Sequence, residues 1–153
     1  MPTITANQQT FSRIVDFVNR FGATRRDGRP YAVNAFRRGE LPLSDGRTVL
    51  FLHFDRHGTE VGEWTNRLEN NGTLITEYAR VGGLGPIENI WRNRKRDLDA
   101  DSPPRVLILG KMGDYNWRFL GEFELCQSQL VGTPACPAWE KWRRVADTVR
   151  TLR

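Results

Sequence analysis

The chain has 153 residues, enough to bury one substantial core, so we expect a single domain over residues 1–153. Its apolar content of 39% is typical of a compact soluble protein, and no apolar run approaches the ~20 residues of a membrane span. The net charge of +5 comes mostly from arginine, which favours an anionic partner only modestly.

Two further features bear on the cellular setting. Residues 1–20 lack the continuous apolar core of a signal peptide. Cys126 and Cys136 stand ten positions apart, which is not a spacing that closes a metal site. We therefore expect a cytoplasmic protein without a metal, a cofactor or a membrane partner.

The first half of the chain predicts a helix followed by strands. Residues 10–22 place apolar side chains at helical spacing, with Thr10 or Ser12 as a cap and Gly22 as the stop. A turn at Asp27-Gly28 precedes a possible short strand at residues 31–36. Residues 48–54 have the β-branched and aromatic content of a central strand.

The second half predicts more strands and a closing helix. Residues 73–81 alternate apolar and polar side chains after the turn signal Asn70-Asn71-Gly72, and the strands predicted at 105–110 and 116–125 form a hairpin. Residues 138–152 carry Trp139, Trp142 and Val149 on one helical side. The sum is an α+β fold with a curved, barrel-like, mostly antiparallel sheet flanked by N- and C-terminal helices.

Motifs for catalysis are weak. His53, Asp55 and His57 would share one face of a strand, which suits a metal ion, but no further histidine is present to complete the site. No Gly-x-Ser-x-Gly elbow occurs, and the glycines at 82, 83 and 85 lack the lysine of a phosphate loop. We expect no catalytic residue in this chain alone.

Side chains that suit nucleic acid are more abundant. Rings can stack on bases, amides can read base edges, and cations can meet phosphates. The candidate base-binding residues are Trp64, Asn66, Glu77, Tyr78, Trp91 and Trp117. The candidate phosphate-binding residues are Arg67, Arg80, Arg92, Arg94, Lys95 and Arg96.

The order of these motifs resembles the PUA-like superfamily. The resemblance rests on Trp64-Thr-Asn-Arg67, the turn at 70–72, the strand that ends in Tyr78, the later Asn93 and the strand Trp117-Arg-Phe-Leu-Gly121. It covers residues 48–125 and includes the SET-and-RING-associated type and the readers attached to modification-dependent restriction endonucleases. The strand at residues 107–110 departs from the pattern because it lacks an aromatic ending.

The resemblance implies a function. Such domains accept a modified base, often methylated or hydroxymethylated cytosine, flipped out of duplex DNA into an aromatic pocket. Trp64 and Tyr78 would then stack on the base, Asn66 and Glu77 would bind its edge, and the arginines would hold phosphates. The partner would be modified double-stranded DNA, together with a nuclease domain or subunit of a restriction or defence system. Two alternatives stay open: an RNA-binding PUA-like module and a small metal-dependent hydrolase that uses His53, Asp55 and His57.

Overall fold

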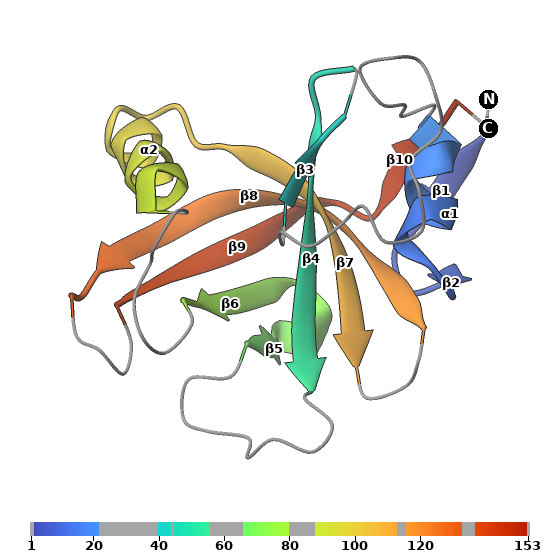
Figure 1. The fold of residues 1–153 in the computed structure, drawn as a ribbon, viewed down its shortest axis with the longest axis horizontal. Helices are drawn as coiled ribbons and strands as arrows, with labels where there is room; N and C mark the ends of the chain where they lie inside the picture. The colour runs from blue at the N-terminus through green and yellow to red at the C-terminus, as the bar shows by residue number, and fades with distance from the viewer. Residues whose placement is uncertain are drawn as a thin grey trace. The chain divides into compact units, whose positions relative to one another are not determined.

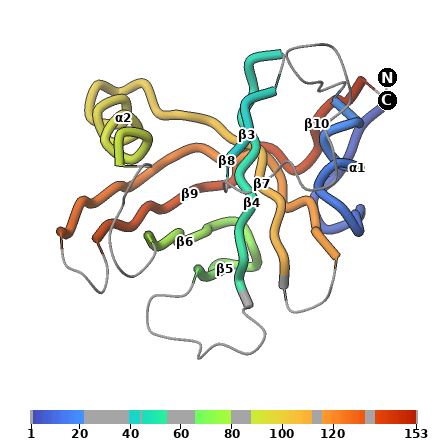
Figure 2. Tube along the Cα trace, in the orientation of Figure 1, coloured from blue at the N-terminus to red at the C-terminus, as the bar shows by residue number. Residues whose placement is uncertain are grey.

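We describe the protein from a computed structural model, which defines residues 2–21, 40–43, 45–55, 66–79, 88–112, 116–132 and 137–152. Contacts between Cα atoms divide the chain into two compact units. Unit 1 combines residues 1–53, 106–122 and 145–153, and unit 2 combines residues 54–105 and 123–144. Strands β8 (Trp117–Leu130) and β9 (Ala138–Ala146) each continue from one unit into the other. Figure 2 follows the chain through both units.

Unit 1 begins with short elements. They are β1 (Thr3–Thr5), β2 (Thr10–Phe11), α1 (Ile14–Val18) and a 3-10 turn, η1 (Asn19–Phe21). The helix predicted over residues 10–22 is therefore shorter than expected. Thr10 and Phe11 instead pair with Arg118 and Trp117 of β8.

Unit 1 also contains β3 (Glu40–Pro42), β10 (Thr148–Arg150) and most of β4 (Thr48–Asp55) and β7 (Arg105–Met112). β4 and β7 confirm the strands predicted at 48–54 and 105–110. Their apolar runs are buried on both faces, as in a central strand. β10 pairs with β1 through Thr3 and Arg150, which brings the two chain ends together (Figure 1).

Aromatic rings fill the core of unit 1. The centre of the Phe17 ring lies 5.4 Å from the ring centre of Phe11, 5.0 Å from that of Phe21 and 5.8 Å from that of Phe119. Phe17 and Phe119 are fully buried. The periodic apolar positions of the predicted first helix therefore face the core, although only part of the segment is helical.

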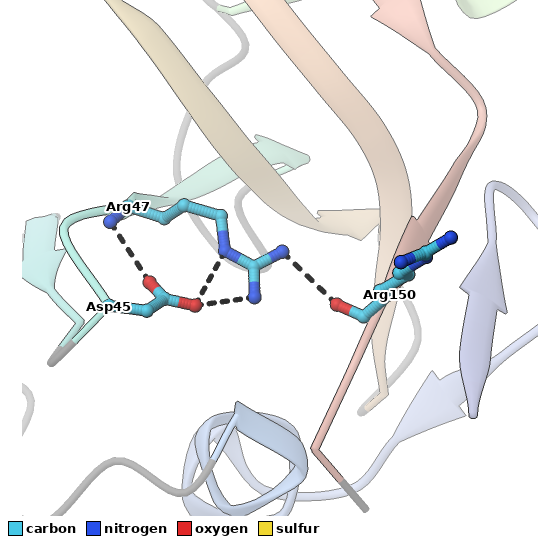
Figure 3. A network of polar contacts seen from close by, with 3 residues as sticks. All are labelled: Asp45, Arg47 and Arg150. Atoms are coloured by element: carbon cyan, nitrogen blue, oxygen red, sulfur yellow. Dashed lines mark hydrogen bonds and ion pairs between the residues drawn. The ribbon is translucent and has the colours of Figure 1, made fainter. Parts of the chain in front are cut away.

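Arg47 ties the turn before β4 to the C-terminal strand (Figure 3). Its Nε donates to Asp45 Oδ2 at 2.8 Å, and its Nη1 donates to the carbonyl oxygen of Arg150 at 3.1 Å. Its guanidinium also lies 4.6 Å from the ring centre of Phe21. The hydrogen bonds from Arg47 hold the pKa of Asp45 below its usual value, so this ion pair persists in mildly acidic solution.

Unit 2 contains β5 (Arg67–Glu69), β6 (Leu74–Tyr78), α2 (Glu88–Asp99) and most of β8 and β9. The turn between β5 and β6 is a 3-10 turn, η2 (Asn70–Gly72), in which all three residues have positive φ. Asparagine and glycine tolerate this region best, which explains the predicted turn at Asn-Asn-Gly. Helix α2 lies beside β8 and β9 (Figure 1).

The hydrogen-bonded strand order is β3-β4-β7-β8-β9-β6-β5 among the described residues. The described registers are antiparallel, whereas β4 and β7 run in the same direction (Figure 1). The order is open, with β3 and β5 as its end strands. The α+β class and the mostly antiparallel sheet are confirmed, and the barrel-like closure is wrong.

The predicted C-terminal helix is also wrong, because residues 138–146 and 148–150 form β9 and β10. Trp139, Trp142 and Val149 satisfy helical spacing, but Ala138, Glu140 and Trp142 are the buried positions, at the period of a strand. A buried glutamate among them hides the alternation in the sequence. The possible strand at 31–36 lies outside the described residues. None of the described helices has the length and apolar content to cross a bilayer.

Candidate nucleic-acid interface

Strands β6 and β9 carry different chemistry on their two faces. In their antiparallel register Tyr78 lies opposite Trp139, and Glu77 lies opposite Glu140. Because successive side chains of a strand point to opposite faces, the two rings share one face and the two carboxyl groups share the other. We call the first the aromatic face and the second the buried face.

The aromatic face brings predicted site residues together. The guanidinium of Arg67 on β5 lies 5.8 Å from the ring centre of Tyr78, within the range of a cation–π contact. The Asn66 side-chain oxygen accepts a hydrogen bond of 2.9 Å from the backbone N–H of Tyr78. Asn66 and Arg67 therefore position the end of β6 that carries this tyrosine, whose ring is partly exposed.

Charged groups continue across the same face. Lys141 of β9 lies 4.0 Å from the Glu69 carboxylate of β5, which also accepts a hydrogen bond from Thr76. Further along, Glu124 of β8 receives hydrogen bonds from Arg105 of β7 and Arg143 of β9. Among the described residues this face thus carries four cations and two carboxylates: Arg67, Arg105, Lys141 and Arg143 with Glu69 and Glu124.

The buried face holds a compact charge cluster. Arg94 of α2 donates to Glu140 Oε2 at 3.0 Å and lies 3.9 Å from Glu77 Oε1. The indole N–H of Trp142 donates to Glu77 at 3.0 Å, and the Arg94 guanidinium lies 5.3 Å from the centre of the Trp142 ring system. Two carboxyl groups placed opposite each other would repel, and Arg94 offsets this repulsion.

Glu140 is the most perturbed group of this cluster. Its side chain is fully buried, and its Oε1 has no hydrogen-bond partner among the described residues. Burial and the nearby charge of Glu77 raise the pKa of Glu140 to about 9, against the opposing effect of Arg94. The two neighbouring carboxyl groups, Glu77 and Glu140, therefore favour holding one proton between them, and Arg94 balances the remaining negative charge.

Three cations of the outer α2 surface each have their own carboxylate. Arg92 pairs with Glu88 at 2.7 Å, Lys95 with Asp99 at 3.2 Å, and Arg96 with Asp97 at 3.1 Å. A hollow of about 310 Å³ opens beside Arg92, lined by Glu88, Arg92, Leu130, Gly132 and Pro137. This surface is electrically balanced, so it offers less attraction to phosphate than the aromatic face does.

The other predicted site residues lie elsewhere. Trp117 is 7% exposed in the core of unit 1, where its ring contacts Phe51 and His53. Trp91 of α2 is buried against Ala79 and Ala138. Glu77 and Arg94 belong to the buried face. Trp64 and Arg80 lie outside the described residues.

The alternative metal site is only partly described. His53 is an exposed residue of β4 whose ring lies 5.2 Å from Trp117. The side chain of Asp55 and all of His57 lie outside the described residues. Within the part of the chain that the structure defines, no three His, Cys, Asp or Glu side chains gather as a metal site would require.

Sequence reasoning missed Arg105, Trp139, Lys141 and Arg143. The last three were assigned to a helix, so their shared position with Tyr78 on one sheet face could not be foreseen. The signal that could have found them is the alternation from Trp139 to Arg143, in which every second residue is aromatic or cationic.

No family model matches the sequence, and no curated protein sequence matches it. The fold, however, resembles two restriction endonucleases. The 5-hydroxymethylcytosine-specific restriction enzyme AbaSI matches 97% of this chain with a TM-score of 0.57 at 19% identity. The MspJI restriction endonuclease, solved in complex with a 27-mer oligonucleotide, matches 94% of it with a TM-score of 0.52 at 10% identity.

The chain spans 42% of the length of AbaSI and 41% of that of MspJI. At these identities the similarity establishes a shared fold. The relation to modification-dependent restriction enzymes that the sequence motifs indicated is thus confirmed as a structural similarity, and it extends beyond residues 48–125 to nearly the whole chain.

Proposed function

We propose that this chain is a DNA-binding reader domain that recognises a modified cytosine, methylated or hydroxymethylated, as the targeting module of a restriction system. The main support is the fold shared with AbaSI and MspJI across nearly the whole chain. The catalytic cleavage would belong to a separate nuclease domain or subunit. We assign no catalytic residue to this chain.

The aromatic face supplies the chemistry for this function. Tyr78 and Trp139 form an adjacent pair of rings on which an extruded base could stack, and Trp64 is the expected second wall. Stacking contributes about 1–3 kcal/mol per base, which offsets much of the few kcal/mol needed to unstack a nucleotide. Asn66 and Arg67 border the rings and hold Tyr78 in place.

Several residues predicted from the sequence are left out of this interface. Glu77 and Arg94 are engaged on the buried face, and Trp91 and Trp117 are core residues. The cations of α2 are matched by carboxylates. Recognition is therefore assigned to Asn66, Arg67, Tyr78 and Trp139, with Trp64 and Arg80 as expected additions.

Binding to matched duplexes tests the proposal. Short DNA duplexes with one cytosine, 5-methylcytosine or 5-hydroxymethylcytosine at the same position, and an RNA duplex of equal length, are titrated by fluorescence anisotropy. We expect about ten-fold or greater preference for one modified DNA, since a small apolar group contributes about 1–3 kcal/mol. Equal affinity for all three DNA duplexes contradicts the proposal, and preference for RNA supports the RNA-binding alternative.

Variants of Tyr78 and Trp139 test where the modified base binds. Tyr78→Ala and Trp139→Ala should remove the preference for the modified duplex, whereas Tyr78→Phe should keep most of it because the ring remains. The fluorescence of 2-aminopurine opposite the modified base reports extrusion and should rise only with the wild-type protein and Tyr78→Phe. Equal loss of affinity for modified and plain DNA in the alanine variants would place the base elsewhere.

A further inference from the structure

Arg105 and Arg143 meet at one carboxylate although they come from different strands. Arg105 Nε donates to Glu124 Oε2 at 3.0 Å, and Arg143 Nη2 donates to Glu124 Oε1 at 3.1 Å. The arginine side chains are 61% and 62% exposed, whereas Glu124 is 15% exposed. The carboxylate of Glu124 is thus the more buried member of the group, and the two guanidinium groups face solvent.

The charge of this group is unbalanced. Two guanidinium groups share one carboxylate, so among the described residues one positive charge has no matching carboxylate, unlike the one-to-one pairs of α2. An arginine has five N–H donors, and each of these two uses a single one on Glu124 in the described part of the chain. The remaining donors suit the oxygens of a phosphate, which planar guanidinium forks bind well.

The position of the group also fits a nucleic-acid strand. Arg143 lies four residues from Trp139 on the same face of β9, a distance of about 13 Å along a strand. Phosphates follow one another at about 3.4 Å of helical rise along one DNA strand. A DNA strand that follows β9 from a base at Trp139 and Tyr78 would bring a phosphate over Arg143 a few nucleotides away.

We infer that Arg105 and Arg143, held by Glu124, form a phosphate-binding site for the DNA strand whose modified base lies against Tyr78 and Trp139. The inference rests on the proposed reader function. It adds a phosphate contact, which does not depend on which base is present. Glu124 is a positioning residue, because it orders both side chains before DNA arrives and so reduces the entropy lost on binding.

The test compares two variants that each lose two positive charges. The sheet variant combines Arg105→Gln with Arg143→Gln. The helix variant combines Arg92→Gln with Arg96→Gln on the exposed surface of α2. The dissociation constants for modified and plain duplexes are measured from 50 to 300 mM salt. One phosphate contributes about 0.9 to the slope of log K against log salt, so loss of this site in the sheet variant should lower the magnitude of the slope by about one. The helix variant should leave the slope unchanged.

The outcomes are distinct. A loss of slope in the sheet variant, equal for modified and plain DNA, supports the inference. Similar losses in both variants would mean that only net charge matters, and an unchanged slope in the sheet variant would also overturn the site. Arg105→Lys with Arg143→Lys keeps the charge, so a retained slope with several-fold weaker binding supports recognition by the guanidinium forks. Full retention of affinity counts against such recognition.

This test separates the inference from the function on which it rests. If the wild-type protein binds plain and modified DNA equally, the reader function fails, and the slope still shows whether the two arginines contact phosphate. If it prefers modified DNA but the sheet variant keeps the full slope, the reader function stands and the phosphate site fails. The melting temperature of each variant confirms folding, which exposed substitutions should leave within a few degrees.

Discussion

Glu140 is a carboxyl group in a position where an alternating strand normally carries an apolar side chain. Burial raises its pKa to about 9, so the folded protein holds a proton that the unfolded chain releases near pH 4 to 5. Between these values the folded state binds more protons than the unfolded state, and stability falls as pH rises. For one proton the slope is at most ~1.4 kcal/mol per pH unit.

This reasoning predicts the behaviour of Glu140→Gln. The amide keeps an oxygen for Arg94 and resembles the protonated acid, so the variant should fold normally. Its stability should depend less on pH between 5 and 9 than that of the wild type, and its relative stability should increase toward pH 9. Urea unfolding at pH 5.5, 7 and 8.5 provides the measurement. Parallel pH profiles for the two proteins would show that Glu140 is already ionised.

The buried side chain of Arg94 joins helix α2 to the sheet. Arg94 links this helix to β6 and β9 through Glu77 and Glu140, and Trp91 is its buried apolar contact. Removing one partner of a buried ion pair leaves an uncompensated charge, which costs about 3–5 kcal/mol. We therefore expect Arg94→Met to destabilise the protein by this amount.

Arg92→Met is the matched control for this prediction. Arg92 lies two residues away on the exposed surface and pairs with Glu88, and such surface pairs contribute about 0–1 kcal/mol. Chemical denaturation compares both variants at pH 7. A similar small effect in both would mean that packing of Trp91, rather than the ion pair, holds the helix.

The sequence predicted the elements whose buried residues are apolar. The strands at β4 and β7 and the turn at Asn70–Gly72 follow directly from local composition. The prediction failed at β9, because Glu140 occupies a core position, where contact with Arg94 of α2 and a raised pKa make its carboxyl group acceptable. The helix α2 was missed for a related reason: its buried side includes Arg94, so its pattern reads as a cationic run. Candidate site residues near β6 were predictable, but those contributed by β9 were not.

Strands β8 and β9 run through both units of the molecule. β8 and β9 each supply residues to both units, so neither unit has a complete set of strands of its own. Phe119 is fully buried in the aromatic core of unit 1 and belongs to β8. A disturbance at Phe119 should therefore reach backbone hydrogen bonds in unit 2.

Phe119→Ala tests this coupling. Loss of a buried phenylalanine costs about 3–5 kcal/mol, and we expect the opening free energy of β6 amides to fall by a comparable amount. Hydrogen exchange followed by NMR or mass spectrometry measures both regions. Phe119→Leu should give the same pattern with a smaller effect. Unchanged protection in β6 would show that unit 2 opens independently.

The antiparallel pairing of Thr3 in β1 with Arg150 in β10 has a practical consequence for engineering. Because the first and last strands lie side by side, a few glycine and serine residues could join the termini into a closed ring. New ends could then be opened in a loop, and reporter groups could be attached there while the β1–β10 ribbon stays intact.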